Sequence, residues 1–484
     1  MIALQQPSLL QSLCLIGGAW QGADNGETFD VLDPASGVCL ASVPAAGRAE
    51  TCRAIDAAEL ALAAWRKRPA QERAALLRRW HDLILANQED LAQLLTAEQG
   101  KPLDDARAEV AYAASFVDWF AEEARRVYGD VIPAPSGDRR ILTLKEPIGV
   151  CGAITPWNFP YAMVTRKVAP ALAAGCTMVL KPAEQTPLCA LALGVLAQQA
   201  GIPDGVFNIV TGDPVAIGRA LTDSPVVRKI SFTGSTQVGR LLMRQSADTL
   251  KKLSLELGGN APFIVYDDAD LDAAVAGLMI AKFRNAGQAC IAANRIYVQR
   301  GIYEDFAARL ARAVYELRVG NGAEPGVEIG PLIDDAAIAK VEAHVQDALR
   351  HGARLLCGGR RHARGRTWFE PTVLADASNA MRLATEETFG PVAPLFPFDA
   401  DDEAISAANA VEYGLGAYVY SRDINRIWRA IDALETGMVG INSGLISTAV
   451  APFGGVKQSG LGREGSKYGL DEYLVLKYVC VGGL

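Results

Sequence analysis

The sequence places one cysteine in a segment whose neighbours favour chemistry. Cys290 lies in FRNAGQACIAANR, with Arg284 six residues before it and Arg295 five residues after it. A free thiol has a pKa of about 8.5 and reacts as the thiolate, so a nucleophilic cysteine needs surroundings that favour deprotonation. Three roles are therefore open for Cys290: an apolar filler, a redox thiol or a catalytic nucleophile.

Two other segments offer a hydrogen-bond donor and a base. In AITPWNFP, prolines on both sides fix the backbone around Asn158, whose side-chain amide can donate hydrogen bonds. In LSLELGGNAPFIV, Glu256 stands at the end of an apolar run. A carboxylate in such a run is costly unless it is paired or used as a base.

Two further segments could hold a dinucleotide. ISFTGSTQVGR predicts a strand, a tight turn at Gly234 and a helix that begins near Ser235, where free amides bind phosphate. Its spacing is not G-x-G-x-x-G, so an ordinary capped turn explains the segment equally well. VLKPAEQTP ends a strand with Lys181 and places Glu184 in the next turn, where the pair could hold ribose hydroxyls. On these residues alone, a solvated turn pair is the favoured alternative.

Length and composition exclude several classes of protein. The 484 residues predict two or three domains, and the net charge of −8 argues against a nucleic-acid partner. No apolar run approaches the roughly 18 residues of a membrane span. The N-terminus lacks a basic region and a cleavage site, so we expect a mature cytoplasmic protein.

The cysteines and histidines are equally uninformative about metals and disulfides. The 9 cysteines are dispersed and none forms C-x-x-C, which is typical of a reducing compartment. Among the 4 histidines, only His344 and His351 could share a helix face, and their spacing is not a usual metal pattern. We therefore expect no metal site.

The elements that must position these side chains follow from the apolar pattern. Residues 49–127 predict helices, interrupted at LysPro 101–102, and ILTL further on predicts a strand. From Gly149, short apolar runs alternate with helical segments, which indicates a parallel sheet that binds ligands beyond the strands' carboxyl ends. A second α/β region follows from about residue 260. The apolar C-terminus predicts a strand that pairs with another element or with another subunit.

Six segments together resemble the NAD(P)-dependent aldehyde dehydrogenases, in that family's order and spacing and over essentially the whole chain. They are PWNFP (156–160), KPAEQTP (181–187), FTGST (232–236), LELGG (255–259), GQAC (287–290) and EETFGP (386–391). Three more look like the succinate-semialdehyde dehydrogenase branch, which includes the glutarate-semialdehyde enzymes: MVTRKVAPALAAGC (163–176), GMVGINSGLIS (437–447) and APFGGVKQSGLGREGSKYG (451–469).

The resemblance implies an α/β fold with a Rossmann-like cofactor domain, an α/β catalytic domain and a small bridging β-sheet. The expected boundaries are 1–123 with 148–257 for the cofactor domain, 258–455 for the catalytic domain, and 124–147 with 456–484 for the oligomerisation segments. Such subunits form homodimers that can pair into homotetramers.

The resemblance also assigns the catalytic residues. Cys290 attacks the aldehyde, and the Asn158 amide and the Cys290 backbone N–H hold the resulting oxyanion, which contributes on the order of 3 kcal/mol per donor. Glu256 activates the water that hydrolyses the thioester, which argues against a CoA-acylating enzyme. Ala292 stands where some relatives carry a second cysteine, so no disulfide beside Cys290 is expected.

By the same resemblance, a further set of residues binds the cofactor: Pro156, Trp157, Lys181, Glu184, Gly212, Thr233, Gly234, Ser235, Leu257, Glu387 and Phe389. Glu184 would accept hydrogen bonds from both adenosine ribose hydroxyls and would repel a 2′-phosphate. We therefore expect NAD to be preferred, with NADP as a possible second cofactor.

The substrate implied by the branch is a small semialdehyde that carries a carboxylate. Arg166, Arg284 and Ser447 match the positions that hold this carboxylate, and succinate semialdehyde, an intermediate of γ-aminobutyrate breakdown, is the expected substrate. The alternatives are glutarate semialdehyde or a broader range of aldehydes. From other classes, a non-catalytic dinucleotide-binding protein and a cofactor-free cysteine hydrolase remain open.

Overall fold

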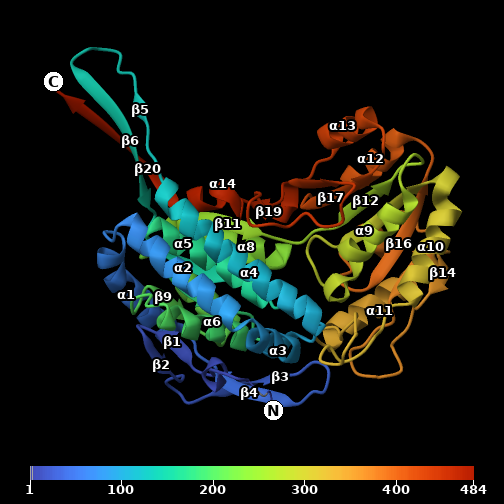
Figure 1. The fold of residues 1–484 in the computed structure, drawn as a ribbon, viewed down its shortest axis with the longest axis horizontal. Coiled ribbons are helices and arrows are strands. Elements are labelled where there is room, and N and C mark those ends of the chain that lie inside the picture. The colour runs from blue at the N-terminus through green and yellow to red at the C-terminus, as the bar shows by residue number, and fades with distance from the viewer. Residues whose placement is uncertain (1, 3, 484) are drawn as a thin grey trace.

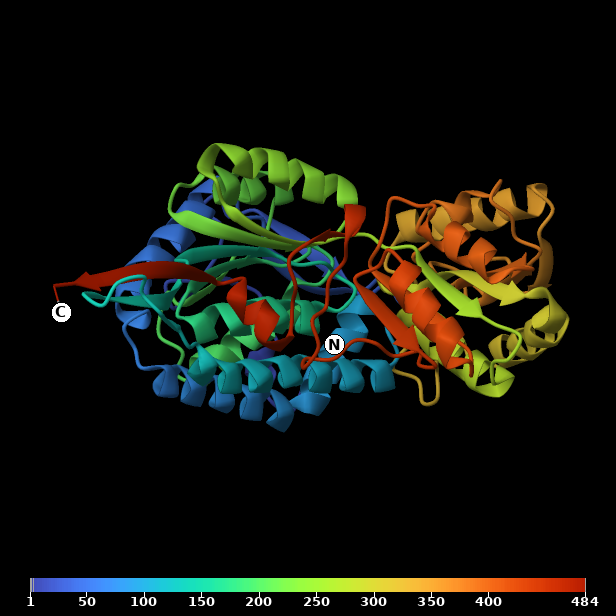
Figure 2. The ribbon, with the colours of Figure 1, turned by 90° about the horizontal axis from the view of Figure 1, so that it is seen from above.

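The computed structural model describes residue 2 and residues 4–483 and shows two α/β bodies and a projecting arm (Figure 1). The first body contains the N-terminal half of the chain and the second contains most of residues 260–440. The two bodies lie side by side, and the arm extends from the far end of the first body (Figure 2).

The first body is built on an eight-stranded sheet with the order β19-β11-β10-β7-β8-β9-β1-β2. Its five central strands are parallel, and the edge strands β19 and β1 pair antiparallel with them. The bounds are β7 (Val150–Ile154), β8 (Thr177–Lys181), β9 (Phe207–Ile209), β10 (Val227–Thr233), β11 (Lys252–Glu256), β19 (Gly460–Leu461), β1 (Cys14–Ile16) and β2 (Ala19–Gln21).

Helices cover both faces of this sheet, as parallel strands require. The larger apolar cluster joins the sheet to helices α2–α6, and a smaller one joins it to α1 and α7. Gly100 ends α3 with a φ of 92°, and Pro102 starts α4, so the break expected at 101–102 is confirmed. The helices are α1 (Arg48–Trp65), α2 (Ala70–Ala86), α3 (Gln88–Gln99), α4 (Leu103–Glu123), α5 (Pro160–Ala174), α6 (Pro187–Gln199), α7 (Pro214–Asp223) and α8 (Thr236–Ser246).

The second body has its own seven-stranded sheet, with the order β14-β15-β16-β13-β12-β17-β18, and its own apolar core. Its strands are β12 (Ala261–Val265), β13 (Ala293–Gln299), β14 (Arg354–Cys357), β15 (Thr372–Ala375), β16 (Val392–Phe398), β17 (Gly416–Tyr420) and β18 (Met438–Ile441). Its helices are α9 (Leu271–Phe283), α10 (Tyr303–Tyr315), α11 (Asp335–Arg350), α12 (Asp401–Asn409) and α13 (Ile424–Ala433).

The projecting arm is an antiparallel sheet of β5 (Val131–Ile132), β6 (Arg139–Pro147) and the C-terminal strand β20 (Leu474–Gly482). The C-terminal strand therefore pairs within its own chain, along the whole of β6. The expected segment 456–484 is divided: β19 joins the first sheet, α14 (Ser466–Asp471) contacts α4 and α5, and only β20 enters the arm.

Strand prediction succeeded in the parallel region and missed the N-terminus. Each short apolar run that predicted a strand between Gly149 and Leu257 forms one, and ILTL lies in β6. The strands that were not predicted include β1 and β2, at one end of the first sheet, the separate pair β3 (Thr28–Leu32) and β4 (Cys39–Pro44), and the two-residue strands β5 and β19. Across the described residues, none of the helices has the length and apolar character needed to cross a membrane.

Candidate active site

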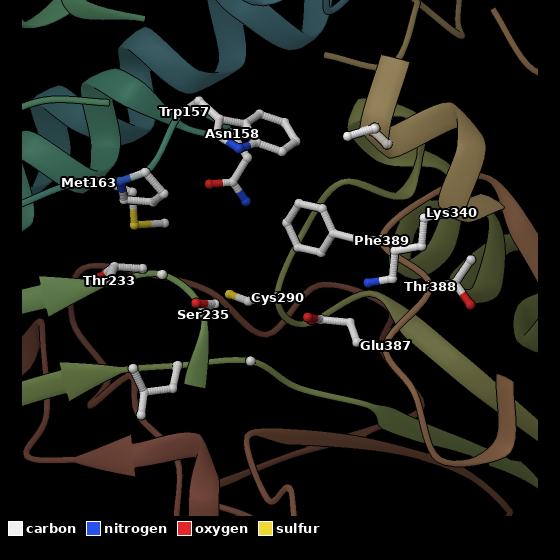
Figure 3. A pocket seen from close by; sticks show the side chains of 16 residues that line it. Trp157, Asn158, Met163, Thr233, Ser235, Cys290, Lys340, Glu387, Thr388 and Phe389 are labelled. Carbon is white, nitrogen blue, oxygen red and sulfur yellow. The ribbon is translucent and has the colours of Figure 1, made fainter. Parts of the chain in front are cut away.

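Cys290 lies where two cavities meet. One cavity of about 350 Å³ lies between the two bodies and is lined by Cys290 together with Asn158, Ser235 and Glu387 (Figure 3). The second is much smaller and is lined by Cys290 together with Arg166, Arg284 and Ser447. The predicted cofactor and substrate residues are thus divided between the two sides of one thiol.

A tight left-handed turn presents Cys290. The turn follows α9 and contains Asn285, Ala286 and Gly287, with φ values of 52°, 55° and 75°. Glycine is required at 287, because a Cβ there would lie 2.3 Å from the Gly390 carbonyl oxygen. The Asn285 N–H donates to Asp105 on α4 over 2.9 Å, so a contact from the first body holds the strained turn.

The Asn158 loop is bonded directly to the Cys290 segment. The Asn158 side-chain amide donates to the Gln288 carbonyl over 3.0 Å. The backbone carbonyl of Asn158 accepts from Asn285 Nδ2 over 2.9 Å and from Lys101 Nζ over 2.8 Å. The amide has a second hydrogen that this bond leaves available. Asn158 and Cys290 are therefore positioned as one unit, as the predicted oxyanion site requires.

Glu256 is buried without a hydrogen-bond partner for either carboxylate oxygen. Burial, followed by the negative charge of Glu464, raises the pKa of Glu256 well above its usual range. The side chain lines neither cavity, although its charge acts on the thiol of Cys290. The structure thus places the predicted base close to the nucleophile but turned away from the open space.

Glu464 organises a buried charge cluster that the sequence analysis missed. Its carboxylate lies 2.7 Å from Arg166 Nε and also contacts the Lys167 ammonium, and Lys167 donates to Thr233 over 2.6 Å. All of these side chains are buried. Arg166 also lines the smaller cavity, and its Nη2 has no hydrogen-bond partner among the described residues.

The thiol of Cys290 is held in its protonated form. Burial raises its pKa to about 12; the negative charge of Glu387 adds to this effect, and the positive charge of Arg166 opposes it. Deprotonation at neutral pH therefore needs an added positive influence or a nearby base.

The larger cavity fits a dinucleotide. Ser235 is the N-cap of α8, and its side chain accepts from the Val238 N–H over 3.3 Å, so the free amides of the helix start face a site for phosphate. The rings of Trp157 and Phe389 both line the cavity and pack edge to face, with their centroids 5.6 Å apart. Glu387 accepts from the Gly259 N–H over 3.1 Å, and burial raises its pKa to about 7.

Three predicted cofactor residues lie outside this cavity. The Lys181 ammonium contacts the Glu184 carboxylate at the end of β8, so each neutralises the other in this structure. Gly212 has a φ of 131°, and a Cβ there would lie 2.1 Å from the Ala46 carbonyl oxygen. Packing against Ala46 is thus a sufficient reason for that glycine. The other predicted cofactor residues, Pro156, Thr233, Gly234 and Leu257 among them, line the cavity.

Several lining residues escaped the sequence analysis. Lys340, Ala336 and Ala337 reach the larger cavity from α11, a helix that carries no motif. Met163 lines both cavities from the first turn of α5. In the smaller cavity, Tyr112 comes from α4, where its spacing only suggested an apolar helix face.

The smaller cavity has a positively charged lining. The Arg166 guanidinium lies 4.1 Å from the ring centre of Phe453, and that of Arg284 lies 5.2 Å from the ring centre of Phe159. The Tyr112 and Ser447 hydroxyls contact each other beside them. No carboxylate belongs to the lining that the described residues form, so two cations and two hydroxyls face the space.

Comparison with known proteins places this geometry among aldehyde-oxidising enzymes. The sequence profile of the aldehyde dehydrogenase family matches residues 20–479. The 3-sulfolactaldehyde dehydrogenase of Pseudomonas putida is 62% identical over 100% of both chains. The succinate-semialdehyde dehydrogenase [NADP(+)] GabD of Escherichia coli (strain K12) is 58% identical over 99% of both.

A solved structure shows the same likeness in three dimensions. The crystal structure of succinate-semialdehyde dehydrogenase from Burkholderia pseudomallei superposes with a TM-score of 0.99 at 61% identity, covering 99% of this chain and 100% of that one. The α/β fold expected from the sequence is thereby confirmed.

Proposed function

Because this chain belongs to the aldehyde dehydrogenase family, we propose that it oxidises succinate semialdehyde to succinate with a nicotinamide dinucleotide. The observation that carries the proposal is the pair of arginines in a small cavity that also holds the Cys290 thiol. A short aldehyde buries little surface, so its selectivity must come from the group at its far end. Two guanidiniums and two hydroxyls suit a carboxylate.

Arg284 is the more available of the two cations. Arg166 already pairs with Glu464, whereas no carboxylate among the described residues forms an ion pair with Arg284. We infer that Arg284 supplies the main attraction for the substrate carboxylate, with Arg166 and Ser447 fixing its orientation. With the carboxylate bound there, the aldehyde end of the substrate is directed toward Cys290.

The proposed reaction begins with the thiolate of Cys290. The sulfur adds to the aldehyde carbon, and the oxyanion of the thiohemiacetal is held by the Asn158 side-chain amide and the Cys290 N–H. The bond from Asn158 to the Gln288 carbonyl aligns that amide before substrate arrives. The nicotinamide ring of the bound cofactor supplies the hydride acceptor, and Cys290 is left as a thioester.

Glu256 is proposed to complete the cycle by taking a proton from the water that hydrolyses the thioester. Its raised pKa makes its carboxylate a stronger base than an exposed glutamate. Because its side chain lines neither cavity, it must rotate toward Cys290 before it can reach that water. The product is succinate, a dicarboxylate.

A sulfonated aldehyde is the second candidate substrate. The relative from Pseudomonas putida is named a 3-sulfolactaldehyde dehydrogenase, and guanidinium groups also bind sulfonate oxygens. Glutarate semialdehyde, which is one methylene longer than succinate semialdehyde, remains the nearest carboxylate alternative. All three substrates share a small anionic group at the end remote from the aldehyde.

NAD is proposed as the preferred cofactor, with NADP second. The relative from Escherichia coli is named for NADP(+), so the proposal depends on Glu184 of this chain. Its carboxylate lies in the turn after β8, where it could accept from both adenosine ribose hydroxyls and would repel a 2′-phosphate. The contact with Lys181 weakens this repulsion without reversing it.

A homodimer, with a tetramer as a further step, is proposed from the arm. Val131, Leu476 and Tyr478 are 76%, 69% and 65% exposed on a sheet too small to have its own core. β20 is an edge strand with one side unpaired, so a second copy could cover both features. Light scattering on the wild type and on Leu476→Glu tests this, and an unchanged oligomer in the variant would contradict it.

The function is tested by a kcat/KM panel. Succinate semialdehyde, glutarate semialdehyde, 3-sulfolactaldehyde and uncharged butanal are each assayed with NAD and with NADP, following NADH or NADPH absorbance. We expect the highest kcat/KM for succinate semialdehyde with NAD. This substrate is an intermediate of γ-aminobutyrate breakdown. A kcat/KM for butanal equal to those of the anionic aldehydes would refute the anion site. Hydrolysis of esters without cofactor, in a protein with no dehydrogenase activity, would indicate a cysteine hydrolase.

Absence of both activities, together with tight dinucleotide binding, would instead support the non-catalytic alternative. No nucleic-acid or membrane partner is part of this proposal. The same panel thus separates the three classes of protein that the sequence left open.

A further inference from the structure

His344 is a buried histidine whose ring bridges the two neighbours of Glu387. Its Nδ1 lies 3.1 Å from the Thr388 hydroxyl and its Nε2 lies 3.2 Å from the Glu386 carboxylate. The ring is fully buried on α11, and Thr388 is buried with it, so solvent does not compete for that bond. The Glu386 carboxylate is partly exposed and also accepts from Arg382. One side chain thus anchors the segment that carries Glu387 from both sides.

The Glu387 segment needs such an anchor because its backbone is strained. Phe389 has a φ of 55°, a conformation that costs a non-glycine residue on the order of 1 kcal/mol or more. In Figure 3, Glu387 and Phe389 point toward the cavity, whereas Thr388 points away from it. The cavity side of the segment therefore carries the cofactor groups, and the opposite side is bonded to His344.

The hydrogens of the two bonds can be assigned from the partners. Burial lowers the pKa of His344, so the ring is neutral and has a single N–H to donate. The Arg382 guanidinium holds the pKa of Glu386 below its usual value, so that carboxylate can only accept. The Nε2–H therefore donates to Glu386, and Nδ1 accepts from the Thr388 hydroxyl.

We propose that His344 is a positioning residue for cofactor binding: it fixes the segment 386–389 so that the Glu387 carboxylate meets the nicotinamide ribose. The inference rests on the cofactor site of the proposed function. α11 also supplies Lys340 to the cavity wall, one turn before His344. A single helix would then provide both a lining residue and the anchor behind the lining.

The test measures dinucleotide binding directly. NADH is titrated into the wild type, His344→Ala, His344→Asn and His344→Gln, with the dissociation constant read by calorimetry and the fold checked by thermal melting. Loss of the buried bond to Thr388 and the partly exposed bond to Glu386 predicts a dissociation constant about tenfold higher for His344→Ala. Asn can keep the acceptor for Thr388 and Gln can keep the donor to Glu386, so both should bind better than Ala.

Two controls make the result specific. His351 is the partly exposed C-cap residue of the same helix, and its side chain contacts Asp347 of α11. His351→Ala should therefore leave NADH binding unchanged. Hydrolysis of p-nitrophenyl acetate without cofactor uses Cys290, Asn158 and Glu256 but not the dinucleotide, and should stay within about twofold of the wild type in His344→Ala.

The inference is overturned if folded His344→Ala binds NADH as tightly as the wild type. It is also overturned if ester hydrolysis falls in the same proportion as binding, since the damage would then be general. Glu387→Gln separates this failure from that of the proposed cofactor site. If Glu387→Gln does not weaken NADH binding, the site assignment is wrong; if it does and His344→Ala does not, only the positioning role is wrong.

Discussion

The two cavities that meet at Cys290 are assembled in different ways. The cofactor cavity is lined largely by short runs of consecutive residues, 156–158, 233–235, 257–258 and 387–389. The first three lie at or just after the ends of strands β7, β10 and β11, and the fourth lies in the loop before β16. The substrate cavity is lined mainly by single residues from distant segments, among them Tyr112, Arg166, Arg284, Ser447 and Phe453. Under the proposed function, the turns that carry these runs would hold the dinucleotide, and the single side chains would hold the small anion.

The cavities also differ in charge, and Cys290 responds to both. Glu387 on the cofactor side raises the pKa of the thiol, whereas Arg166 on the substrate side lowers it. Binding of an anionic substrate adds a second negative influence on the side of the arginines. The comparison therefore predicts which substitutions disable the whole site and which disable only one half of it.

Substitution at the junction has the largest expected effect, because both halves depend on it. Cys290→Ala should abolish dehydrogenase and esterase activity, since no other group is placed to attack. Glu256→Gln should release a rapid burst of NADH and then stall at the thioester, because hydride transfer precedes the step that needs the base. Stopped-flow absorbance measures both, and a wild-type steady-state rate in Glu256→Gln would refute its role.

Substitution on the substrate side should separate the two halves. Arg284→Ala removes a charge-assisted bond worth ~2 kcal/mol and should raise KM for succinate semialdehyde about 30-fold. Butanal and NAD should keep their KM values within about twofold. Arg166→Ala should act in the same direction but also destabilise the fold, because it leaves Glu464 with one cation fewer.

Arg295 provides the matched control for these arginines. It is buried five residues after Cys290 and donates to the carbonyls of Asn260, Ala407 and Ala408 rather than facing a cavity. Arg295→Lys should lower the melting temperature. It should leave the ratio of kcat/KM for succinate semialdehyde to kcat/KM for butanal unchanged. An equal loss for butanal and succinate semialdehyde in Arg284→Ala would show that Arg284 is structural as well.

The pH dependence of Cys290 alkylation reports how the charges of Glu387 and Arg166 shift the pKa of the thiol. Because the folded thiol has a pKa near 12, iodoacetamide labelling of the cofactor-free protein should keep rising with pH above 9. Glu387→Gln removes a negative charge and should move the profile to lower pH; Arg166→Ala removes a positive charge and should move it to higher pH. Mass spectrometry of the Cys290 peptide gives the profile, and shifts of the opposite sign would contradict the arrangement.

A smaller effect is expected at Tyr112, whose hydroxyl contacts Ser447. Tyr112→Phe removes one neutral hydrogen-bonding group of the anion site, worth ~1 kcal/mol, and should raise KM for succinate semialdehyde about fivefold. The ring stays packed on Phe116, so the fold and the KM for butanal should not change. Steady-state kinetics with both aldehydes test this, and a parallel rise for butanal would assign Tyr112 to general packing.

The smallest expected effect is on disulfide formation. All 9 cysteines are free in the structure, and the residue two places after Cys290 is Ala292. Mild peroxide can oxidise the Cys290 thiol itself, but no intramolecular disulfide that includes it should appear. Peptide mapping without reduction tests this, and such a disulfide would overturn the prediction.

Much of the cofactor side could be predicted from the sequence. Strands β7, β8, β10 and β11 were visible as apolar runs, and the residues that follow them line the cavity or its approach. This works because the carboxyl ends of neighbouring parallel strands meet at one edge, so a local pattern fixes a common location. Asn158 and Ser235 were found in this way, and the resemblance then assigned their roles.

Tertiary packing decided the rest. Strands β1 and β2 are short and pair with each other, and only the pairing of β1 with β9 joins them to the first sheet. Tyr112, Lys340 and His344 sit in helices with no motif, because a helix face says which side is buried but not what it faces. The pairing of Arg166 with Glu464 joins residues nearly 300 positions apart, a contact that no local spacing encodes.

The sequence alone thus predicted the class of fold and pointed to Cys290, Glu256 and Asn158 as the candidate nucleophile, base and oxyanion donor, because each lies in a short segment with a recognisable pattern. The folded chain alone decided the thiol's environment: which charge stands on which side of Cys290, how deeply it is buried, and which helix supports the cofactor glutamate. Those properties depend on distances between segments, and burial and Coulomb interactions are set by distance in space rather than along the chain.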